Sequence, residues 1–208
     1  MDSDFQCKDG VLKHYTGPGG CVILPEDITE IGNNVFEYRR DITDVVIPLG
    51  ITKIGTYAFS DCSGLTQLTI PEGVTEIKAK AFCNCFGLAQ VNLPNSLTQL
   101  GKWAFFGCRS LVKINLPDGI EIIRDSTFYQ CIALSQIKLP AQLACIEARA
   151  FYRCNSLRRV ELPPKMVEVK NGAFLECAAL EYVEIQGKRT DVKRGAFRGC
   201  PIKGIVKC

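Results

Sequence analysis

Short stretches of alternating apolar and polar residues recur along this chain and predict β-strands. Four of them are LTQLTIP (65–71), LAQVNLP (88–94), LVKINLP (111–117) and LSQIKLP (134–140). Alternation with a period of two is typical of a strand that buries one face, and the closing proline lacks the N–H that would continue a sheet. Each strand is followed by a brief turn, a second extended piece such as VTEI (74–77), and an AFxxC segment that we expect to form a tight turn or a single helical turn.

The same unit repeats at a fixed interval, and the phenylalanines show it best. They recur every 23 residues, without insertion or deletion, at Phe36, Phe59, Phe82, Phe105, Phe128, Phe151, Phe174 and Phe197. Three residues later stands Arg39 in the first unit and a cysteine in all others, at Cys62, Cys85, Cys108, Cys131, Cys154, Cys177 and Cys200. Twelve residues after the phenylalanine comes a proline, at Pro48, Pro71, Pro94, Pro117, Pro140 and Pro163, before Gln186 ends the series.

None of these pieces can bury its apolar side alone, but stacked units can, so the repeat predicts a solenoid. We expect a leucine-rich-repeat-like, right-handed coil of about eight 23-residue repeats with a parallel β-sheet face, in which Phe packs on Phe and Cys on Cys. The chain, 1–208, is predicted to be one domain with an N-terminal cap (1–24), repeats (25–197) and a C-terminal cap (198–208). In the first cap, GVLKHY and CVILP should form a hairpin-like lid; in the last unit, Lys203 replaces the regular leucine.

The pattern VTxIxxxAFxxCxxLxxVxLP resembles the BspA-type leucine-rich repeat, also called the Treponema-type repeat. The resemblance covers about residues 11–200, and the opening DGVLKHYTGPGGCVILPEDITEIG is similar to the segment with which these domains often begin. The family is known mainly as surface and secreted proteins of bacteria and protists. The resemblance therefore implies a role in adhesion or protein binding, at the cell surface or outside the cell.

Composition and charge narrow the class of protein without adding a function. The 208 residues are 47% hydrophobic and 23% charged, which is ordinary for a folded domain. A formal net charge of +3 is too small to argue for nucleic acid or membrane as a partner. No apolar run approaches the roughly 20 residues of a membrane span. The opening MDSDFQCKDG is acidic and polar, unlike a secretory signal, so a cytoplasmic location is kept as the alternative.

The twelve cysteines could form a metal site, disulfides or a packed interior ladder. Zinc needs four converging ligands, whereas the only close pair is the CxC of residues 83–85 and a ladder holds its sulfurs in a line. Ladder neighbours would lie about 5 Å apart, but their parallel side chains and their odd number disfavour disulfides. We expect reduced, buried ladder thiols that pack as small hydrophobes, and no metal. Disulfides are expected only at the ends, where Cys7–Cys21 and Cys200–Cys208 are the possible pairs.

The sequence shows no constellation suited to catalysis. His14 is the only imidazole, and it lies in KHYTGPGG, where a solvated turn residue is a simpler interpretation than a general base. The glycine-rich TGPGG (16–20) lacks the GK[ST] ending of a phosphate-binding loop. The carboxylates are scattered, without a repeated pair suited to acid–base work. We therefore predict a protein that is not an enzyme and uses no cofactor.

The polar positions of the alternating strands predict a binding surface. In LAQVNLP, Val91 and Leu93 face the interior, so Gln90 and Asn92 face outward. Repetition of this register gives two exposed columns on the sheet, and solenoids often bind partners on such extended surfaces. The residues chosen as the candidate partner-binding face are Gln90, Asn92, Lys113, Asn115, Gln136, Lys138, Arg158, Arg159, Glu161, Tyr182 and Glu184.

Within this face, Arg159 and Tyr182 are the first choices, because Arg and Tyr are frequent interface hot spots. We expect a protein partner of unidentified kind and a monomeric chain. Nucleic acid is not expected, since no aromatic residues interleave the cations. The alternative function is a structural spacer or an intracellular scaffold without a dedicated ligand, in which stacked amides merely form a soluble ladder.

Overall fold

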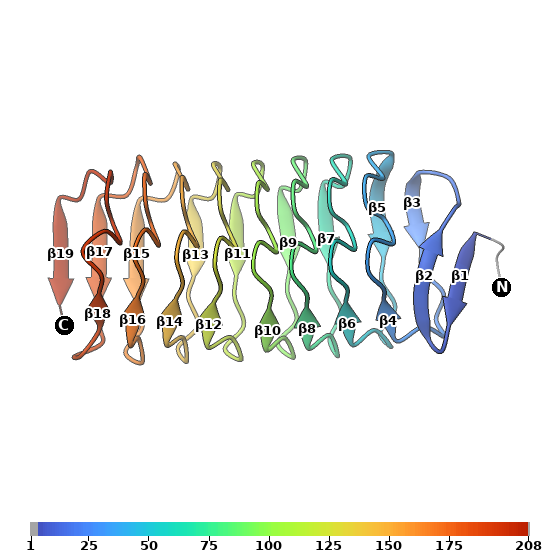
Figure 1. The fold of residues 1–208 in the computed structure, drawn as a ribbon, viewed down its shortest axis with the longest axis horizontal. Helices are drawn as coiled ribbons and strands as arrows, with labels where there is room; N and C mark the ends of the chain where they lie inside the picture. Colours follow the sequence, from blue (N-terminus) through green and yellow to red (C-terminus); the bar gives the residue numbers. More distant parts are fainter. Residues whose placement is uncertain (1–3, 208) are drawn as a thin grey trace.

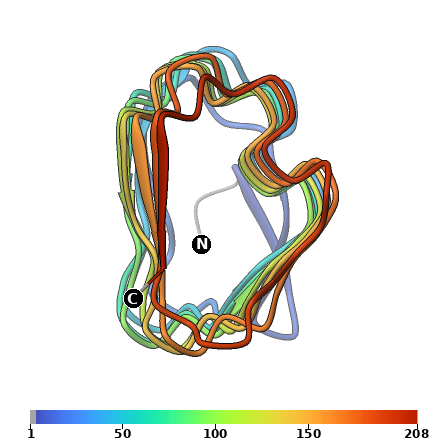
Figure 2. The same cartoon turned by 90° about the vertical axis from the view of Figure 1, so that its left-hand side faces the viewer.

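The computed structural model describes residues 4–207, which wind into a parallel β-solenoid of about nine coils. Figure 1 shows two rows of short strands along the long axis, with a hairpin at the N-terminal end and a single strand at the C-terminal end. Viewed along that axis in Figure 2, the coils superimpose as one closed outline with a straight sheet side. The sequence predicted about eight repeats; the additional coil arises because the opening segment contributes a strand to each row.

Every strand is short, because the chain turns a corner after two to five residues. The first row consists of β3 (Gly20–Ile23), β5 (Ile42–Val46), β7 (Gln67–Thr69), β9 (Gln90–Asn92), β11 (Lys113–Asn115), β13 (Gln136–Lys138), β15 (Arg159–Leu162), β17 (Tyr182–Ile185) and β19 (Gly204–Lys207). The second row consists of β2 (Val11–Tyr15), β4 (Glu30–Ile31), β6 (Lys53–Ile54), β8 (Glu76–Ile77), β10 (Gln99–Leu100), β12 (Ile122–Ile123), β14 (Cys145–Ile146), β16 (Glu168–Val169) and β18 (Asp191–Val192). The outward side of the first row is called the sheet face below.

Strand pairing follows the period of the sequence. Gln67 lies beside Gln90 and Arg159 beside Tyr182, each pair 23 residues apart, so equivalent repeat positions are neighbours in space. In the first row β3 pairs with β5, β7 to β13 form one sheet, and β15 to β19 form another. In the second row the sheets end and restart between β10 and β12. Among the described residues, the first row is therefore interrupted between β5 and β7 and again between β13 and β15, and the second row between β10 and β12.

The interior confirms the predicted stacking of the phenylalanines. From Phe36 to Phe197, neighbouring ring centroids lie 4.9–5.6 Å apart and the ring planes are within 17° of parallel. The rings from Phe36 to Phe174 have no exposed surface. The column continues past the repeats, because Tyr15 lies 5.4 Å from Phe36 and Phe5 lies 4.9 Å from Tyr15. Burial of these large apolar side chains is the main source of stability that the coils share.

The AFxxC corners consist of tight turns, one of the two forms predicted, and not of single helical turns. No helix occurs among residues 4–207, and so none that could cross a membrane. Around Phe59, the residues two before and two after it, Tyr57 and Asp61, have φ angles of 56° and 60°, and most coils repeat this arrangement. Left-handed residues interrupt a helix. The N–H of Phe59 instead donates to the carbonyl oxygen of Ala81 in the next coil at 2.8 Å. The corners therefore bind neighbouring coils to one another.

The cysteine ladder lies inside these corners and makes a contact that the sequence did not indicate. Each ladder thiol donates a hydrogen bond to the main-chain carbonyl oxygen of the phenylalanine 26 residues earlier, as Cys85 does to Phe59 at 3.0 Å. Over the seven rungs the sulfur–oxygen distances are 2.9–3.2 Å. The rungs from Cys62 to Cys177 are fully buried, which confirms the predicted packing. A cysteine thus fills a narrow space and supplies a weak donor to a buried carbonyl group.

The N-terminal end is closed by β1 (Phe5–Lys8), which pairs antiparallel with β2. The sequence predicted a hairpin between GVLKHY and CVILP, and this pairing is wrong. CVILP supplies β3, which runs parallel to β5, because the chain crosses from the second row to the first and already begins to coil. Arg39, in place of the first ladder cysteine, donates to the carbonyl oxygen of Gly17 at 2.9 Å and lies over the ring of Tyr15.

The C-terminal end carries no such hairpin among the described residues. β19 pairs with β17 in a register one residue short, so that Tyr182 lies beside Gly204. The shift lets Ile202 pack against the core where Lys203 stood in the predicted register. Beyond it, Ile205 and Val206 are 50% and 58% exposed. The predicted Cys200–Cys208 pair cannot be placed, since Cys208 lies outside the described residues.

Candidate binding surface

The strands of the first row present the predicted columns to the outside. On β9, Gln90 and Asn92 are exposed while Val91 between them is buried, and Lys113 and Asn115 are exposed on β11 in the same way. The remaining residues of the candidate face are also exposed, with Glu184 half-buried. Parallel pairing in register then sets these side chains in columns on one side of the solenoid.

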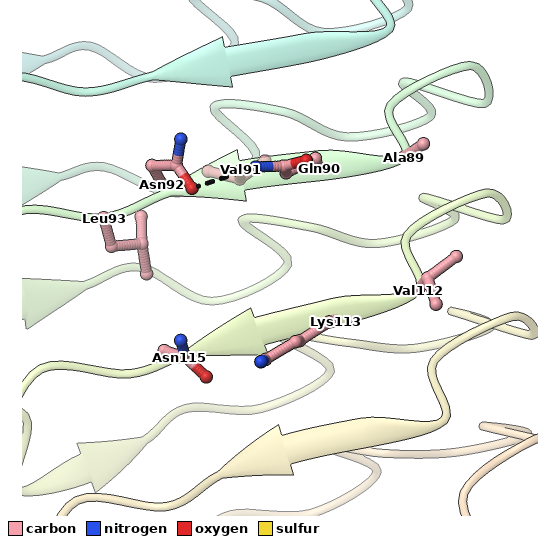
Figure 3. Close-up of a pocket in the computed structure, with 8 residues that line it drawn as sticks. All are labelled: Ala89, Gln90, Val91, Asn92, Leu93, Val112, Lys113 and Asn115. Carbon is pink, nitrogen blue, oxygen red and sulfur yellow. Dashed lines mark hydrogen bonds between the residues drawn. The ribbon is translucent and has the colours of Figure 1, made fainter.

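The neutral part of the face is a ladder of amide and hydroxyl groups. Asn92 Nδ2 donates to Thr69 Oγ1 on the neighbouring strand at 3.0 Å. Gln90 Nε2 donates to Asn92 Oδ1 at 3.3 Å, the contact drawn as a dashed line in Figure 3. These bonds order the amides against one another, but they leave further amide donors and acceptors available to a ligand.

A first hollow, of about 450 Å³, lies over β9 and β11 (Figure 3). It lies where the pairing between these strands is reduced to a single position, Lys113 beside Gln90, whereas β11 and β13 pair over three residues. Leu93, predicted to face the interior, is only partly buried here. The hollow is lined by Ala89, Gln90, Val91, Asn92, Leu93, Val112, Lys113 and Asn115.

A second hollow, of about 840 Å³, adjoins the first and shares Lys113 and Asn115 with it. It spans the interruption between β13 and β15, where the apolar side chains of Ile137 and Leu139 are partly exposed. It is lined by Lys113, Asn115, Asp118, Ser135, Gln136, Ile137, Lys138, Leu139, Ala141, Arg158, Arg159, Glu161, Pro163, Pro164 and Gln186. Most of the candidate face therefore surrounds one continuous hollowed strip.

Charged residues at the C-terminal side of the strip pair with one another. Arg159 lies 2.9 Å from Glu161 and 2.7 Å from Glu184. Such exposed pairs contribute little to stability, and a partner can replace them at small cost. Tyr182 lies beside Arg159 in the sheet and is 50% exposed. Tyr182 and Glu184 flank the strip without lining either hollow.

The hollows also involve apolar residues that sequence reasoning missed. Leu93, Ile137 and Leu139 occupy positions whose equivalents in other coils, such as Leu116 and Val160, are buried. The alternating pattern alone gives no reason to separate them from the core, since it places all of them inward. Their exposure gives the strip an apolar floor beneath its polar rim.

Metal and acid–base chemistry find little support in the arrangement. His14 is exposed on β2, far along the chain from the sheet-face residues. Within residues 4–207 no group of three or more His, Cys, Asp or Glu side chains is placed to hold a metal ion.

The thiols differ in their readiness to ionise. Burial raises the pKa of Cys85 well above its usual range, and it raises the pKa of Cys62 to about 12 and that of Cys83 to about 11. The half-buried Cys200 is the exception, because its interaction with the neighbouring Cys177 side chain lowers its pKa. Ladder thiols are thus poor nucleophiles, with Cys200 the most reactive of them.

The other disulfide predicted as possible, Cys7–Cys21, concerns the N-terminal end. Cys7 is half-buried on β1 and Cys21 is exposed on β3, two strands that belong to different sheets. Both are free thiols in this structure.

Comparison with known proteins agrees with this architecture. Residues 21–112 and 75–203 match the family described as BspA type leucine-rich repeat region, with six copies of the repeat. No curated protein sequence matches the chain significantly.

Several solved structures share the fold. A leucine-rich cell surface protein from Faecalibacterium prausnitzii A2-165 aligns with a TM-score of 0.71 and 22% identity, over 99% of this chain and 75% of that one. The leucine-rich repeat protein of T. pallidum aligns with a TM-score of 0.67 and 24% identity, over 92% of this chain and 85% of that one. A leucine-rich repeat protein from Bacteroides ovatus ATCC 8483 aligns with a TM-score of 0.64 and 26% identity, over 98% of this chain and 68% of that one.

Proposed function

The chain belongs to the BspA-type leucine-rich repeat family, and from this premise we propose that it is a noncatalytic module that binds a protein partner through the sheet face. Leucine-rich repeats of this family are commonly protein-binding or surface proteins, and the fold is typically noncatalytic. The observation that supports the proposal most directly is the hollowed strip, because it gathers most of the predicted polar and basic residues around one concavity.

The sheet face carries cations that are available to a partner. In the second row some charges pair between coils, as Lys53 does with Glu76 at 3.8 Å and Lys170 with Glu147 at 3.5 Å, whereas Lys102 and Arg124 beside it form no ion pair among the described residues. Across the described residues, three cations of the sheet face form no ion pair: Lys113, Lys138 and Arg158. Unpaired charges on a surface steer and select a charged partner.

We propose an adhesion-like setting for this binding. The Faecalibacterium prausnitzii protein is described as a cell surface protein, and its fold covers nearly the whole of this chain. The competing role is a spacer or intracellular scaffold without a dedicated ligand, and the ordered Asn92–Thr69 ladder is what such a passive surface would also show. The two roles differ in whether changes on the sheet face alter binding.

The test is an affinity capture from host and bacterial lysates, with quantitative mass spectrometry. The double variant Arg159→Glu, Tyr182→Ala should lose the partners that the wild-type chain retains, because it removes both expected hot-spot side chains.

The matched control makes the same two types of substitution elsewhere on the surface. Arg149→Glu with Tyr38→Ala alters the same residue types at exposed corner positions, away from the sheet face. This control should capture the same proteins as the wild type. If both double variants retain every partner, or if the wild type captures nothing above a blank matrix, the binding role of the sheet face is refuted.

A further inference from the structure

The interruption between β13 and β15 is a distinct feature of the sheet face, called the seam below. Strand pairing among the described residues runs from β7 to β13 and restarts at β15. On either side it is intact, since β11 pairs with β13 over three residues and β15 with β17 over four. In Figure 1 the two strands stand visibly further apart than their neighbours. The facing edges of β13 and β15 therefore present main-chain donors and acceptors to whatever fills the seam.

The seam opens only at the sheet face. At the opposite corner of the same coils, Phe128 and Phe151 remain stacked with centroids 5.3 Å apart. A complete extra strand needs about 4.8 Å on each side, so it cannot insert between β13 and β15. A ligand must instead lie across the seam and send side chains into it. The hollow of about 840 Å³ is of the size that small-ligand sites commonly have.

The floor of the seam is apolar. Ile137 and Leu139 are partly exposed there, whereas Ile114 and Leu116 one coil earlier are 1% and 3% exposed. Core side chains left partly in contact with water favour a ligand that covers them with apolar groups.

The rim of the seam is basic. Lys113, Lys138 and Arg158 line the hollow without an ion pair among residues 4–207. Its carboxylates are already engaged, because Asp118 accepts a hydrogen bond from the N–H of Ala141 at 3.2 Å and Glu161 pairs with Arg159. The charge that remains for a ligand is positive.

We propose that the seam binds an extended segment of the partner protein in which acidic side chains alternate with apolar ones. This rests on the proposed function of the sheet face and names the partner's chemistry. In an extended segment, alternate side chains point to opposite sides, so apolar groups reach Ile137 and Leu139. The acidic groups lie on the other side of the segment and bend toward the rim, where they reach Lys138 and Arg158. An acidic polysaccharide would pair with the basic residues of the rim but would offer no apolar groups to cover Ile137 and Leu139.

The test uses fluorescence anisotropy with labelled synthetic peptides and the full chain. The probes are a peptide that alternates glutamate and valine, one that alternates glutamate and serine, one that alternates lysine and valine, and heparin as a purely acidic polymer. The glutamate–valine peptide should bind at least about tenfold more tightly than each of the others, because it alone satisfies both floor and rim. Equal or tighter binding of the glutamate–serine peptide or heparin would overturn the proposal.

Variants locate the site. The double variant Lys138→Glu, Arg158→Glu should lower the affinity for the glutamate–valine peptide by about tenfold or more, because both cations of the rim become anions. Leu139→Glu should also weaken binding of this peptide, because it places a charge in the apolar floor. If circular dichroism shows that this variant is unfolded, the Lys138→Glu, Arg158→Glu variant alone tests the site. The control Lys102→Glu, Arg149→Glu reverses two exposed cations away from the sheet face and should leave the affinity unchanged. Equal weakening by this control would refute the site.

The outcome separates this proposal from the broader one. Lysate partners that depend on Arg159 and Tyr182 but not on Lys138 and Arg158 would leave the sheet face as the binding surface and refute the seam. Partners that depend on neither pair would refute both.

Discussion

The first and last coils of the described solenoid are covered to different extents. At the N-terminal end, the antiparallel strands β1 and β2 cover the first coil, and Tyr15 and Phe5 extend the column of rings beyond Phe36. At the C-terminal end, β19 is the last strand of its sheet, and Phe197 is only partly buried. One end thus continues the interior column into a cap of different shape, while the other stops with its last ring half covered.

The difference shows what closing a solenoid requires. A parallel coil leaves its last apolar layer and a row of main-chain groups open, so an end needs either a cap or a tolerant sequence. Arg39 is part of the N-terminal cap: its guanidinium pairs with Asp41 at 2.9 Å and donates a hydrogen bond to the carbonyl oxygen of Gly17. A cysteine at this position would have no phenylalanine 26 residues earlier whose carbonyl oxygen it could contact. Near the other end of the described residues, Lys203 and Lys207 are exposed beside and on β19, and charged residues on a strand edge discourage association.

The largest expected effect is that of removing the N-terminal cap. Deletion of residues 1–24 uncovers the ring of Phe36 and the first strands of both rows, so cooperative thermal unfolding should be lost and the chain should aggregate. Circular dichroism melting and light scattering measure both. Deletion of residues 204–208 is the matched control, and it should keep a cooperative transition because Ile205, Val206 and Lys207 are already exposed. Unaltered melting of the first variant would contradict the role given to the cap.

Single rings give the next largest effect and compare the two ends directly. Phe36→Ala and Phe105→Ala remove fully buried rings and should each lower the free energy of unfolding by about 3–5 kcal/mol. Phe197→Ala should lower it by clearly less, because its ring is stacked on one side only. Urea denaturation measures all three. A loss below about 1 kcal/mol at Phe105 would mean that its ring is not buried as described.

Sequence reasoning predicts the interior of this protein well, because every buried position repeats. A period of 23 residues places Phe105 on Phe82 and Cys108 on Cys85 without any knowledge of the corner geometry. The same register correctly turns Gln90 and Asn92 outward. Period alone could not give the conformation of the corners, since left-handed residues such as Tyr57 are held by hydrogen bonds between coils rather than by their own preference.

The hollows and the seam could not be predicted from the alternating pattern, and the residue at the close approach between coils does not predict them either. A Cβ atom on Gly64 would lie 2.3 Å from the carbonyl oxygen of Arg40, so coils with glycine here approach closely. The equivalent residue at the seam is Ser156, and its hydroxyl donates to the carbonyl oxygen of Ile132 at 2.8 Å. However, Ala133 and Ala179 stand at the same position in coils whose strands remain paired, and pairing also stops between β5 and β7, where Gly64 stands. The residue at this position therefore does not predict the seam. Only the structure shows which carbonyl group the glycine approaches.

The cap illustrates the same limit. GVLKHY and CVILP are both apolar enough for strands, and a hairpin between them was the local solution. The structure instead pairs the first with FQCK and sends the second to β5, because non-local stacking on the first coil buries more apolar surface than a local turn would.

The smallest expected effect is a gradient of thiol reactivity along the ladder, which leaves stability untouched at neutral pH. Thiolates are the nucleophiles, and burial raises the pKa of Cys62 to about 12 and that of Cys85 and Cys108 well above the usual range. Near the C-terminal end of the described residues, Cys200 is half-buried, and its interaction with the neighbouring Cys177 side chain lowers its pKa.

Native alkylation at pH 8 followed by mass spectrometry should therefore modify Cys200 first among the rungs, at a rate approaching that of the exposed control Cys21. The rungs at the capped end and in the middle should react only when denaturant opens the fold, because they are buried and remain protonated. The gradient follows the difference between the two ends. A rung is protected when a complete coil covers it on both sides, and within residues 4–207 no complete coil follows Cys200. Modification of Cys108 as fast as Cys21, or ladder cysteines joined to one another, would show that the sulfurs are accessible and that the column is not packed as the structure describes.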